Sequence, residues 1–345
     1  MAPYDAFLLV SFGGPEGPDD VLPFLRNVTA GRGVPPERLE QVAEHYYHFG
    51  GVSPINQQCR DLLAAAEKDF AASGIGLRLY WGNRNWEPYL TDTVAAMAAD
   101  GVTRALAFVT SAYSSYSGCR QYLGDIDRAR QSAGPAAPRI DKIRQYFNHP
   151  GFIEPFAAGV ADAASTLDPA VRDDYDLVFT AHSIPLTMAA ASGPGGGAYT
   201  AQLAEAAGLV AGRLGYRRPW RLAYCSRSGP PSQPWLEPDI NDCLADLAAA
   251  GSRAVVVSPI GFVSDHMEVR FDLDLEAAQT ASRLGLGFAR AATPGTDPRF
   301  VSMISDLVRE RVTGADPAWL GSLGPGHDEC QADCCGLGVP RPAGR

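Results

Sequence analysis

One histidine stands where acid–base or metal chemistry is feasible. His182 lies in the segment TAHSIP at 180–185, directly after a run of apolar residues. Its imidazole can accept a proton near neutral pH, or bind a metal ion when it is neutral. A lone histidine at such a turn is more often an ordinary polar residue, so this position alone does not assign a role.

Three carboxylates follow at a regular spacing in the segment 264–276. Glu268, Asp272 and Glu276 are four residues apart, and on a helix they would form one acidic stripe. Arg270 is the one Arg or Lys in this segment and cannot share that face. Because like charges at this spacing repel each other, the stripe is unusual for a plain solvated face. It suits a path for hard divalent cations, which prefer oxygen ligands.

The elements that must position these residues alternate between strand and helix. Short apolar runs predict strands at 6–10, 77–80, 105–110, 176–180, 221–224 and 254–258. Helical patterns lie at 21–27, 38–47, 54–72, 92–100, 203–214, 239–249 and 300–312. This alternation predicts an α/β fold with parallel sheets.

The two halves of the chain resemble each other at matching places. Segment 8–15 pairs with 178–185, and 101–110 pairs with 251–258. We therefore expect two similar Rossmann-like domains that face each other across a cleft, with ligands beyond the carboxyl ends of the strands. From about residue 313 onward no periodic apolar pattern remains, which indicates a tail.

Composition and charge exclude several classes of protein. The chain has 345 residues, of which 46% are hydrophobic and 20% charged, so disorder is not its main state. A net charge of −10 argues against general binding to nucleic acid or anionic membranes. No apolar run reaches the roughly 18 residues of a membrane span. The first residues have no basic start and lead straight into a strand-like run, so we expect no cleaved secretory signal. We expect a cytoplasmic protein without a transmembrane segment.

Aromatic and hydroxyl side chains gather in the segments 46–54, 81–89 and 112–122. Most of these aromatic residues are also compatible with a plain core. Aromatic faces mixed with hydroxyls and arginine are nevertheless what a large, flat, anionic ligand needs. The phosphate-binding glycine motifs do not follow the first strand, and a Gly-x-Ser-x-Gly elbow is absent, which disfavours nucleotide enzymes and serine hydrolases.

Six motifs in order resemble the ferrochelatase family, and most closely its actinobacterial coproporphyrin III ferrochelatases. They are SFGGP at 11–15, GGVSPI at 50–55, GNRNWEP at 82–88, TAHSIP at 180–185, PWLEPD at 234–239 and PIGFVSDHME at 259–268. The resemblance implies two chelatase-type domains around a porphyrin cleft and insertion of Fe²⁺ into coproporphyrin III. Insertion into protoporphyrin IX, a cobalt or nickel chelatase, and a non-catalytic haem- or iron-binding protein remain open alternatives.

The resemblance also implies roles for the acidic and basic residues. His182 matches the family's motif histidine, a proton acceptor, a ligand of the metal, or both. Glu268 matches the carboxylate across the macrocycle from it, and we expect these two residues to be catalytic. Asp272 and Glu276 match an acidic ladder that serves as a route for metal or protons.

Ser53 and Tyr122 match the family's contacts to the porphyrin propionates. Arg84, Arg120 and Arg227 are candidates for further contacts, because coproporphyrin carries four propionates and protoporphyrin two. Phe12 departs from the family pattern. Many relatives carry Tyr there, whereas Phe has no oxygen to ligate iron.

Three of the seven cysteines lie in the tail, at Cys330, Cys334 and Cys335. A subset of the family carries a [2Fe–2S] cluster, which as a rule needs four thiolates. The resemblance implies Cys119 as the fourth ligand, with Cys225 and Cys243 as alternatives. Zinc or free thiols are the plain alternative to a cluster.

The expected organisation has three parts. An N-terminal domain covers residues 1–148, a C-terminal domain covers 149–312, and the cysteine-containing tail covers 313–345. The expected partners are coproporphyrin III and Fe²⁺, together with a downstream enzyme of the haem pathway that accepts the reactive product.

Overall fold

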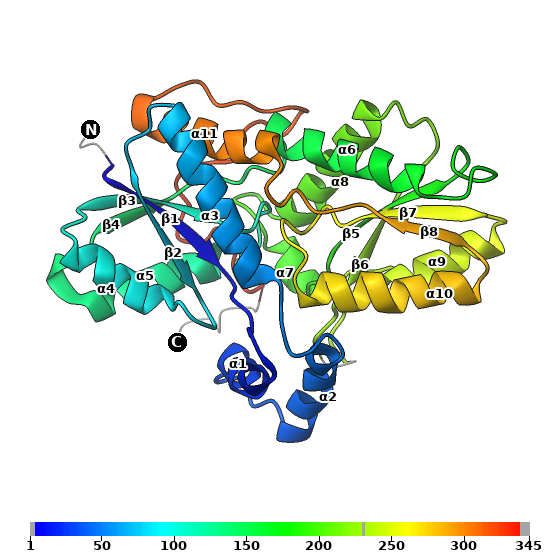
Figure 1. Ribbon diagram of the computed structural model, residues 1–345, viewed down its shortest axis with the longest axis horizontal. Helices are drawn as coiled ribbons and strands as arrows, with labels where there is room; N and C mark the ends of the chain where they lie inside the picture. Colours follow the sequence, from blue (N-terminus) through cyan, green and yellow to red (C-terminus); the bar gives the residue numbers. More distant parts are fainter. Residues whose placement is uncertain (1–3, 230–231, 339–345) are drawn as a thin grey trace, which may run out of the picture.

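Two four-stranded parallel sheets with the same strand order form the frame of the protein (Figure 1). The computed structural model describes residues 4–229 and 232–338. The first sheet has the order β2-β1-β3-β4, and the second has the order β6-β5-β7-β8. Their strands are β1 (Ala6–Ser11), β2 (Arg78–Asn83), β3 (Arg104–Val109), β4 (Arg139–Lys142), β5 (Asp176–His182), β6 (Arg221–Cys225), β7 (Ala254–Ser258) and β8 (Gly287–Arg290). The second order repeats the first, which confirms the predicted internal repeat.

Helices cover both faces of each sheet. In the first lobe these are α3 (Ile55–Ala72), α4 (Leu90–Ala99) and α5 (Gln121–Ala133); in the second they are α6 (Pro150–Ser165), α8 (Ala198–Arg213), α9 (Ile240–Ala249) and α10 (Ala278–Arg283). Strand β1 is buried along its whole length. Phe7 and Leu9 pack into the core that contains α3, whereas Leu8 and Val10 pack into the core that contains α4 and α5. A strand buried on both faces is typical of a parallel sheet between helical layers.

Shorter elements and one last helix complete the two lobes. Helices α1 (Val21–Val28) and α2 (Pro36–Tyr47) project from the first sheet, and α7 (Leu186–Ala190) follows β5 (Figure 1). Two segments are 3₁₀-helices, η1 (Pro18–Asp20) and η3 (Gly134–Ala136), and two are π-helices, η2 (Tyr116–Arg120) and η4 (Val269–Ala277). Helix α11 (Pro298–Thr313) packs against both α3 and α6, so it joins the two lobes. Within the described ranges, no helix has the length and apolar character of a membrane span.

Several elements were not predicted from the sequence. The two outer strands β4 and β8 have four residues each, and the segment RIDK of β4 contains three charged residues. Helix α5 is largely polar, and α6 contains Pro155 in its interior. These segments lack the apolar periodicity on which the prediction depended, and tertiary packing forms them instead.

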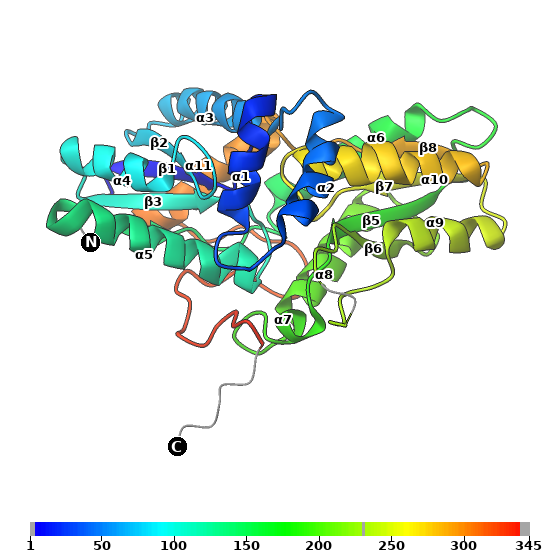
Figure 2. The ribbon, with the colours of Figure 1, turned by 90° about the horizontal axis from the view of Figure 1, so that it is seen from below.

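The segment after α11 contains no helix or strand up to residue 338, as predicted for a tail. It runs along the side of the molecule on which α5 and α7 lie (Figure 2). The carboxylate of Glu205 on α8 accepts hydrogen bonds from the Ser322 amide at 2.8 Å and the Leu323 amide at 3.0 Å. Arg144 donates to the Ala318 carbonyl at 2.9 Å. These bonds attach the tail to the body of the protein.

Candidate active site

The loops that follow the strands of the two sheets touch each other. Tyr113, which follows β3, donates its hydroxyl to the Ile260 carbonyl, which follows β7, at 2.9 Å. The Asp265 amide donates to the side-chain oxygen of Gln58 on α3 at 2.9 Å. The carboxyl ends of both sheets therefore meet, as expected for the ligand site of this architecture.

His182 is the last residue of β5, and its surroundings fix its orientation. The Tyr199 hydroxyl donates to the His182 carbonyl at 2.8 Å. The Nδ1 atom of the ring contacts the Ser183 carbonyl, which can only accept, so Nδ1 carries a hydrogen. This leaves Nε2 directed at Glu268, with 3.6 Å between Nε2 and Oε1. The imidazole remains about one third exposed, at 32%.

His182 and Glu268 shift each other's pKa in opposite directions. Burial lowers the pKa of His182, but the charge of Glu268 and a hydrogen bond to it outweigh burial and raise the pKa to about 9. Burial raises the pKa of Glu268, but the charge of His182 outweighs it and lowers the pKa to about 2. Without substrate, the two residues are therefore an imidazolium–carboxylate pair at neutral pH.

The expectation that Glu268 lies across the macrocycle from His182 is wrong for this structure. A flat ring in van der Waals contact on both faces needs about 7 Å between the flanking atoms, since carbon contacts lie near 3.5 Å. The two side chains are 3.6 Å apart, so both must approach a bound ring from one side.

The acidic stripe is present, but its helix is a π-helix rather than an α-helix. Segment η4 (Val269–Ala277) is bonded from i to i+5, a rare form that is frequent at functional sites. Arg270 lies away from the stripe, because it pairs with Asp274 at 3.3 Å and stacks over the Phe49 ring. Arg270 therefore does not neutralise the stripe directly.

Asp272 is the member of the stripe whose protonation is most perturbed. Ser226, at the end of β6, donates a hydrogen bond to its carboxylate. Burial raises the pKa of Asp272, and the charges of Glu268 and Glu276 raise it further. The hydrogen bond from Ser226 lowers the pKa but does not cancel these effects, and the pKa is about 7. Burial also raises the pKa of Glu276, although this side chain is exposed at the outer end of the row.

Helix α2 covers the carboxylate row. The His45 ring stacks on Phe271 of η4 with 3.6 Å between the centroids. Burial and the nearby charges of Glu268 and Asp272 raise the pKa of the Tyr46 phenol. Tyr46 was not predicted as a site residue, although it belongs to the aromatic segment 46–54.

The two predicted propionate contacts lie in the first lobe, apart from the His182–Glu268 pair. Ser53 is buried in the turn before α3, where its amide donates to the Pro15 carbonyl at 2.8 Å. Tyr122 is buried on α5, and the Arg84 guanidinium lies 5.0 Å from the centre of its ring. The same guanidinium lies 5.7 Å from the Phe12 ring.

The three candidate arginines are already engaged. Arg84 pairs with Asp125 at 2.7 Å. Arg227 donates to the Gln233 carbonyl at 3.2 Å. Arg120 donates to the Cys334 carbonyl at 2.9 Å, so it holds the tail, and its expected role toward a propionate is not supported.

The tail cysteines meet Cys119 at one place. Cys119, Cys334 and Cys335 form a buried cluster, and Cys330 packs against it. Hydrogen bonds from Cys330 and Cys335 lower the pKa of Cys119 well below its usual range. The Gly193 amide donates to the Cys335 sulfur at 3.2 Å, which connects the cluster to the second lobe.

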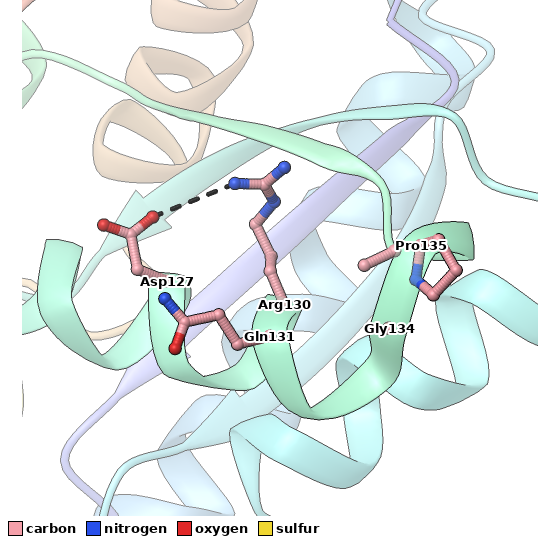
Figure 3. Close-up of a pocket in the computed structure, with 6 residues that line it drawn as sticks. Asp127, Arg130, Gln131, Gly134 and Pro135 are labelled. Atoms are coloured by element: carbon pink, nitrogen blue, oxygen red, sulfur yellow. Dashed lines mark ion pairs between the residues drawn. The ribbon is translucent and has the colours of Figure 1, made fainter.

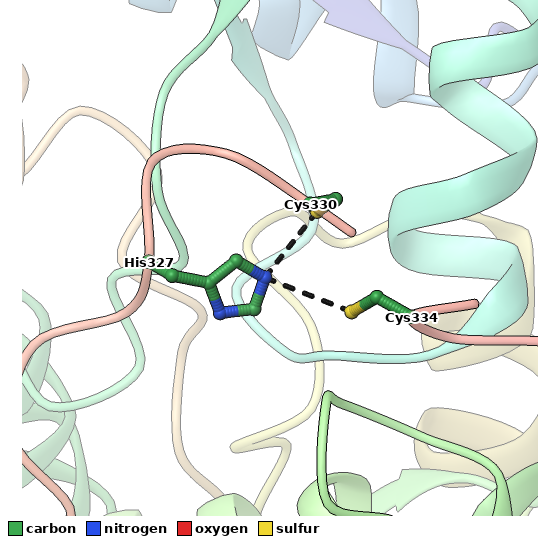
Figure 4. Close-up of side chains that lie close together, drawn as sticks. All are labelled: His327, Cys330 and Cys334. Carbon is green, nitrogen blue, oxygen red and sulfur yellow. Dashed lines mark hydrogen bonds between the residues drawn. The ribbon is translucent and has the colours of Figure 1, made fainter. Parts of the chain in front are cut away.

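The alternative cysteines do not reach this cluster. Cys225 and Cys243 lie in the core of the second lobe, on β6 and α9. His327 was not predicted as a site residue, but its Nε2 atom lies 3.4 Å from the Cys330 sulfur and 3.6 Å from the Cys334 sulfur (Figure 4). A histidine three residues before a cysteine was the available signal.

A shallow pocket at the end of α5 is separate from both sites. It has a volume of about 230 Å³ and is lined by Asp127, Arg130, Gln131, Gly134, Pro135 and Ala137 (Figure 3). Its charged groups partly satisfy each other, because Arg130 and Asp127 lie 3.9 Å apart. The lining contains no group that connects it to the chemistry at His182.

Two solved structures with a chelatase-type fold share this architecture. SirB from Bacillus subtilis with Fe³⁺ superposes with a TM-score of 0.52 at 11% identity, covering 90% of this chain and 96% of that chain. The multi-domain protein DR2241 from Deinococcus radiodurans also gives a TM-score of 0.52, at 15% identity, covering 90% of this chain and 55% of that chain. At these identities the likeness concerns the fold alone.

Sequence comparison identifies the family, which the likeness of folds alone does not. The family model "Ferrochelatase" matches residues 4–312. The coproporphyrin III ferrochelatase of Streptomyces coelicolor is 55% identical, over 99% of this chain and 96% of the relative. That of Mycolicibacterium smegmatis is 57% identical over 91% and 92%, and the ferrochelatase of Rhodopirellula baltica is 55% identical over 99% and 95%. The chain therefore belongs to the ferrochelatase family.

Proposed function

We propose that this enzyme inserts Fe²⁺ into coproporphyrin III and releases two protons. The observation that carries the proposal is the His182–Glu268 pair, 3.6 Å apart at the inner end of a carboxylate row. Relatives named coproporphyrin III ferrochelatase, at 52–57% identity, support this porphyrin as the substrate. Metal insertion needs a base for two pyrrole N–H groups and a path for a hard cation, and these residue types supply both.

In this mechanism the incoming metal ion activates the base. A protonated His182 cannot accept a proton, and Glu268 keeps it protonated through a pKa of about 9. Fe²⁺, which enters as substrate along Glu276 and Asp272, brings positive charge to Glu268. This charge replaces the imidazolium as the counter-charge, lowers the pKa of His182 and releases its proton. The free Nε2 atom then takes a proton from a pyrrole nitrogen.

Asp272 is suited to carry protons away. Because its pKa is about 7, its carboxyl group can both accept and release a proton near neutral pH. Each pyrrole proton passes from the ring to His182 and then to the carboxylate row. Two such transfers balance the charge of the Fe²⁺ that replaces the two protons.

The first lobe is proposed to hold the porphyrin. Ser53 and Tyr122 offer hydroxyl donors for propionates, and Phe12 offers an apolar ring beside Arg84. In this proposal the N-terminal domain (1–148) contributes most of the porphyrin contacts, the C-terminal domain (149–312) contributes His182 and the carboxylate row, and residues 313–345 form the tail. The site works in the cytoplasm in this proposal, and a downstream haem-pathway enzyme accepts the product.

The cysteine cluster is proposed to hold a [2Fe–2S] centre through Cys119, Cys330, Cys334 and Cys335. The donor set fits, because four thiols gather at one place and three of them are buried. The lowered pKa of Cys119 favours the thiolate that a cluster requires. When bound, such a cluster supplies a one-electron redox centre. Its ligands connect the tail to η2 of the first lobe and, through the bond from Gly193, to the second lobe.

An anaerobic insertion assay with coproporphyrin III and protoporphyrin IX side by side tests the proposed function. We expect rapid insertion of iron into coproporphyrin III and much slower insertion into protoporphyrin IX at equal concentration. Preference for protoporphyrin IX would overturn the substrate assignment, and insertion into neither would overturn the proposed activity.

A further inference from the structure

The tail contains a donor group that the proposed all-cysteine cluster does not use. The imidazole of His327 and the thiols of Cys330 and Cys334 have one ligand atom each within 4.8 Å of one another (Figure 4). We propose that these three side chains form a second, mononuclear binding mode for one divalent ion of the zinc class, adopted when the cluster is not assembled. This binding mode involves the tail alone and does not depend on the proposed enzymatic activity.

The two nitrogen–sulfur distances match those of a tetrahedral metal site. With metal–sulfur bonds near 2.3 Å and metal–nitrogen bonds near 2.0 Å, the edges of a tetrahedron are about 3.5 Å for N···S and about 3.8 Å for S···S. His327 Nε2 lies 3.4 Å from the Cys330 sulfur and 3.6 Å from the Cys334 sulfur. The Cys335 sulfur lies 3.7 Å from that of Cys334, but Cys335 is not part of the three-residue group, so water can take the fourth position.

The composition of the donor set selects the class of metal. One imidazole and two or three thiolates are a usual ligand set of structural zinc, whereas hard ions such as Mg²⁺ and Ca²⁺ prefer oxygen. The carboxylate row near His182 consists of oxygen donors instead. The two places in the chain therefore differ in the metal chemistry that they favour.

The mononuclear mode and the cluster differ in whether they require His327 or Cys119. His327, Cys330 and Cys334 all come from the tail, within eight residues of sequence. Cys119 comes from η2, more than 200 residues earlier, and is needed only for the four-cysteine set. The mononuclear mode thus requires His327 and not Cys119, whereas the cluster requires Cys119 and not His327.

Titration of cluster-free, full-length protein with Co²⁺ under anaerobic conditions tests this inference. We expect one Co²⁺ per chain with the visible bands of tetrahedral coordination and a sulfur-to-cobalt charge-transfer band. His327→Ala should weaken Co²⁺ binding by at least about tenfold. Loss of a residue that only orients a metal ligand already costs about 10- to 100-fold in metal affinity, and His327 would be a ligand itself. Cys119→Ser should leave the affinity within about threefold, as should the control Glu329→Ala at an exposed neighbouring position.

Two results of this titration would overturn the inference. One is His327→Ala protein that binds Co²⁺ as tightly as the wild type. The other is Cys119→Ser protein that loses the site to the same extent as His327→Ala. X-ray absorption of the zinc-loaded wild type needs no variant, and a shell of sulfur alone, without imidazole, would contradict the proposal as well. The colour of the proteins as isolated tests the cluster separately, since Cys119→Ser should bleach it and His327→Ala should not.

Discussion

The two lobes share a topology but differ in what stands at the end of their central strands. Strand β1 leads into Phe12, and the equivalent strand β5 ends at His182. Phe12 packs against the Phe24 ring, with 6.2 Å between the centroids, and against Arg84. His182 pairs with Glu268 instead. The repeated scaffold thus provides two equivalent positions. In the proposed function, Phe12 at the first position helps to bind the porphyrin, and His182 at the second accepts its protons.

The largest expected effect comes from exchanging each of these two side chains for alanine. His182→Ala should lower iron insertion by about 10²- to 10⁴-fold, which is the usual contribution of a general base, and leave porphyrin affinity nearly unchanged. Phe12→Ala should weaken porphyrin binding and leave the rate of the bound complex within a few-fold. Fluorescence titration and single-turnover insertion measure the two quantities separately. Equal losses of both quantities in both variants would remove the distinction between the lobes.

The tail contacts both lobes, so a change there probes the proposed cluster without touching the active site. Cys334→Ser should abolish the visible absorption of the cluster and most of its bound iron. Cys243→Ser, at a buried cysteine in the core of the second lobe, is the matched control and should keep both. Absorption spectra and iron analysis of the purified proteins check this expectation. An unchanged spectrum of Cys334→Ser would exclude Cys334 as a ligand.

The charge pair in the second lobe predicts a specific change in titration. Glu268→Gln should lower the pKa of His182 from about 9 to near or below 6.5, because its main stabilising charge is removed. The raised pKa also means that the pair stabilises the folded protein below pH 6.5 and loses this effect as pH rises through 9. NMR titration of the His182 ring and unfolding at several pH values measure both. A pKa unchanged by Glu268→Gln would contradict the pairing.

The smallest effect is expected at the exposed end of the carboxylate row. Glu276→Gln should raise the KM for Fe²⁺ by roughly threefold, because one solvent-screened charge contributes little to attraction of a cation. Glu67→Gln, an exposed carboxylate on α3 of the first lobe, should leave the KM unchanged. Initial rates at varied Fe²⁺ concentration give both values. An equal change in both variants would mean that general surface charge, not the row, attracts the metal.

The sequence predicted the central strands and singled out His182 and Glu268, but it did not predict how these two side chains lie relative to each other. Apolar runs identify β1 and β5 because both are buried. His182 is the last residue of β5, whereas Glu268 follows β7 by ten residues and directly precedes η4. Spacing alone could not distinguish a π-helix from an α-helix at η4, since positions four apart remain close in both. It also could not show that the two side chains lie on one side of a ring, because this depends on how η4 packs beside β5.

Contacts between segments that are distant in the sequence could not be predicted from it either. The charges of Glu268 and Asp272 act on Tyr46 because α2 packs on η4 through His45 and Phe271. Cys119 could be matched to the tail by resemblance, whereas His327 was missed because it fits no four-cysteine pattern. In both cases the tertiary contact, and not the local pattern, identifies the residue.

Simultaneous measurement of iron insertion and proton release tests the division between the lobes most directly. Protein loaded with coproporphyrin III is mixed anaerobically with Fe²⁺ in weak buffer that contains a pH indicator, in a single turnover. For the wild type we expect two protons per iron, released at the rate of the porphyrin absorbance change. For His182→Ala we expect both signals to slow together by at least about 10²-fold while porphyrin remains bound. Wild-type rates of insertion and proton release in this variant would contradict the assignment of the base to His182.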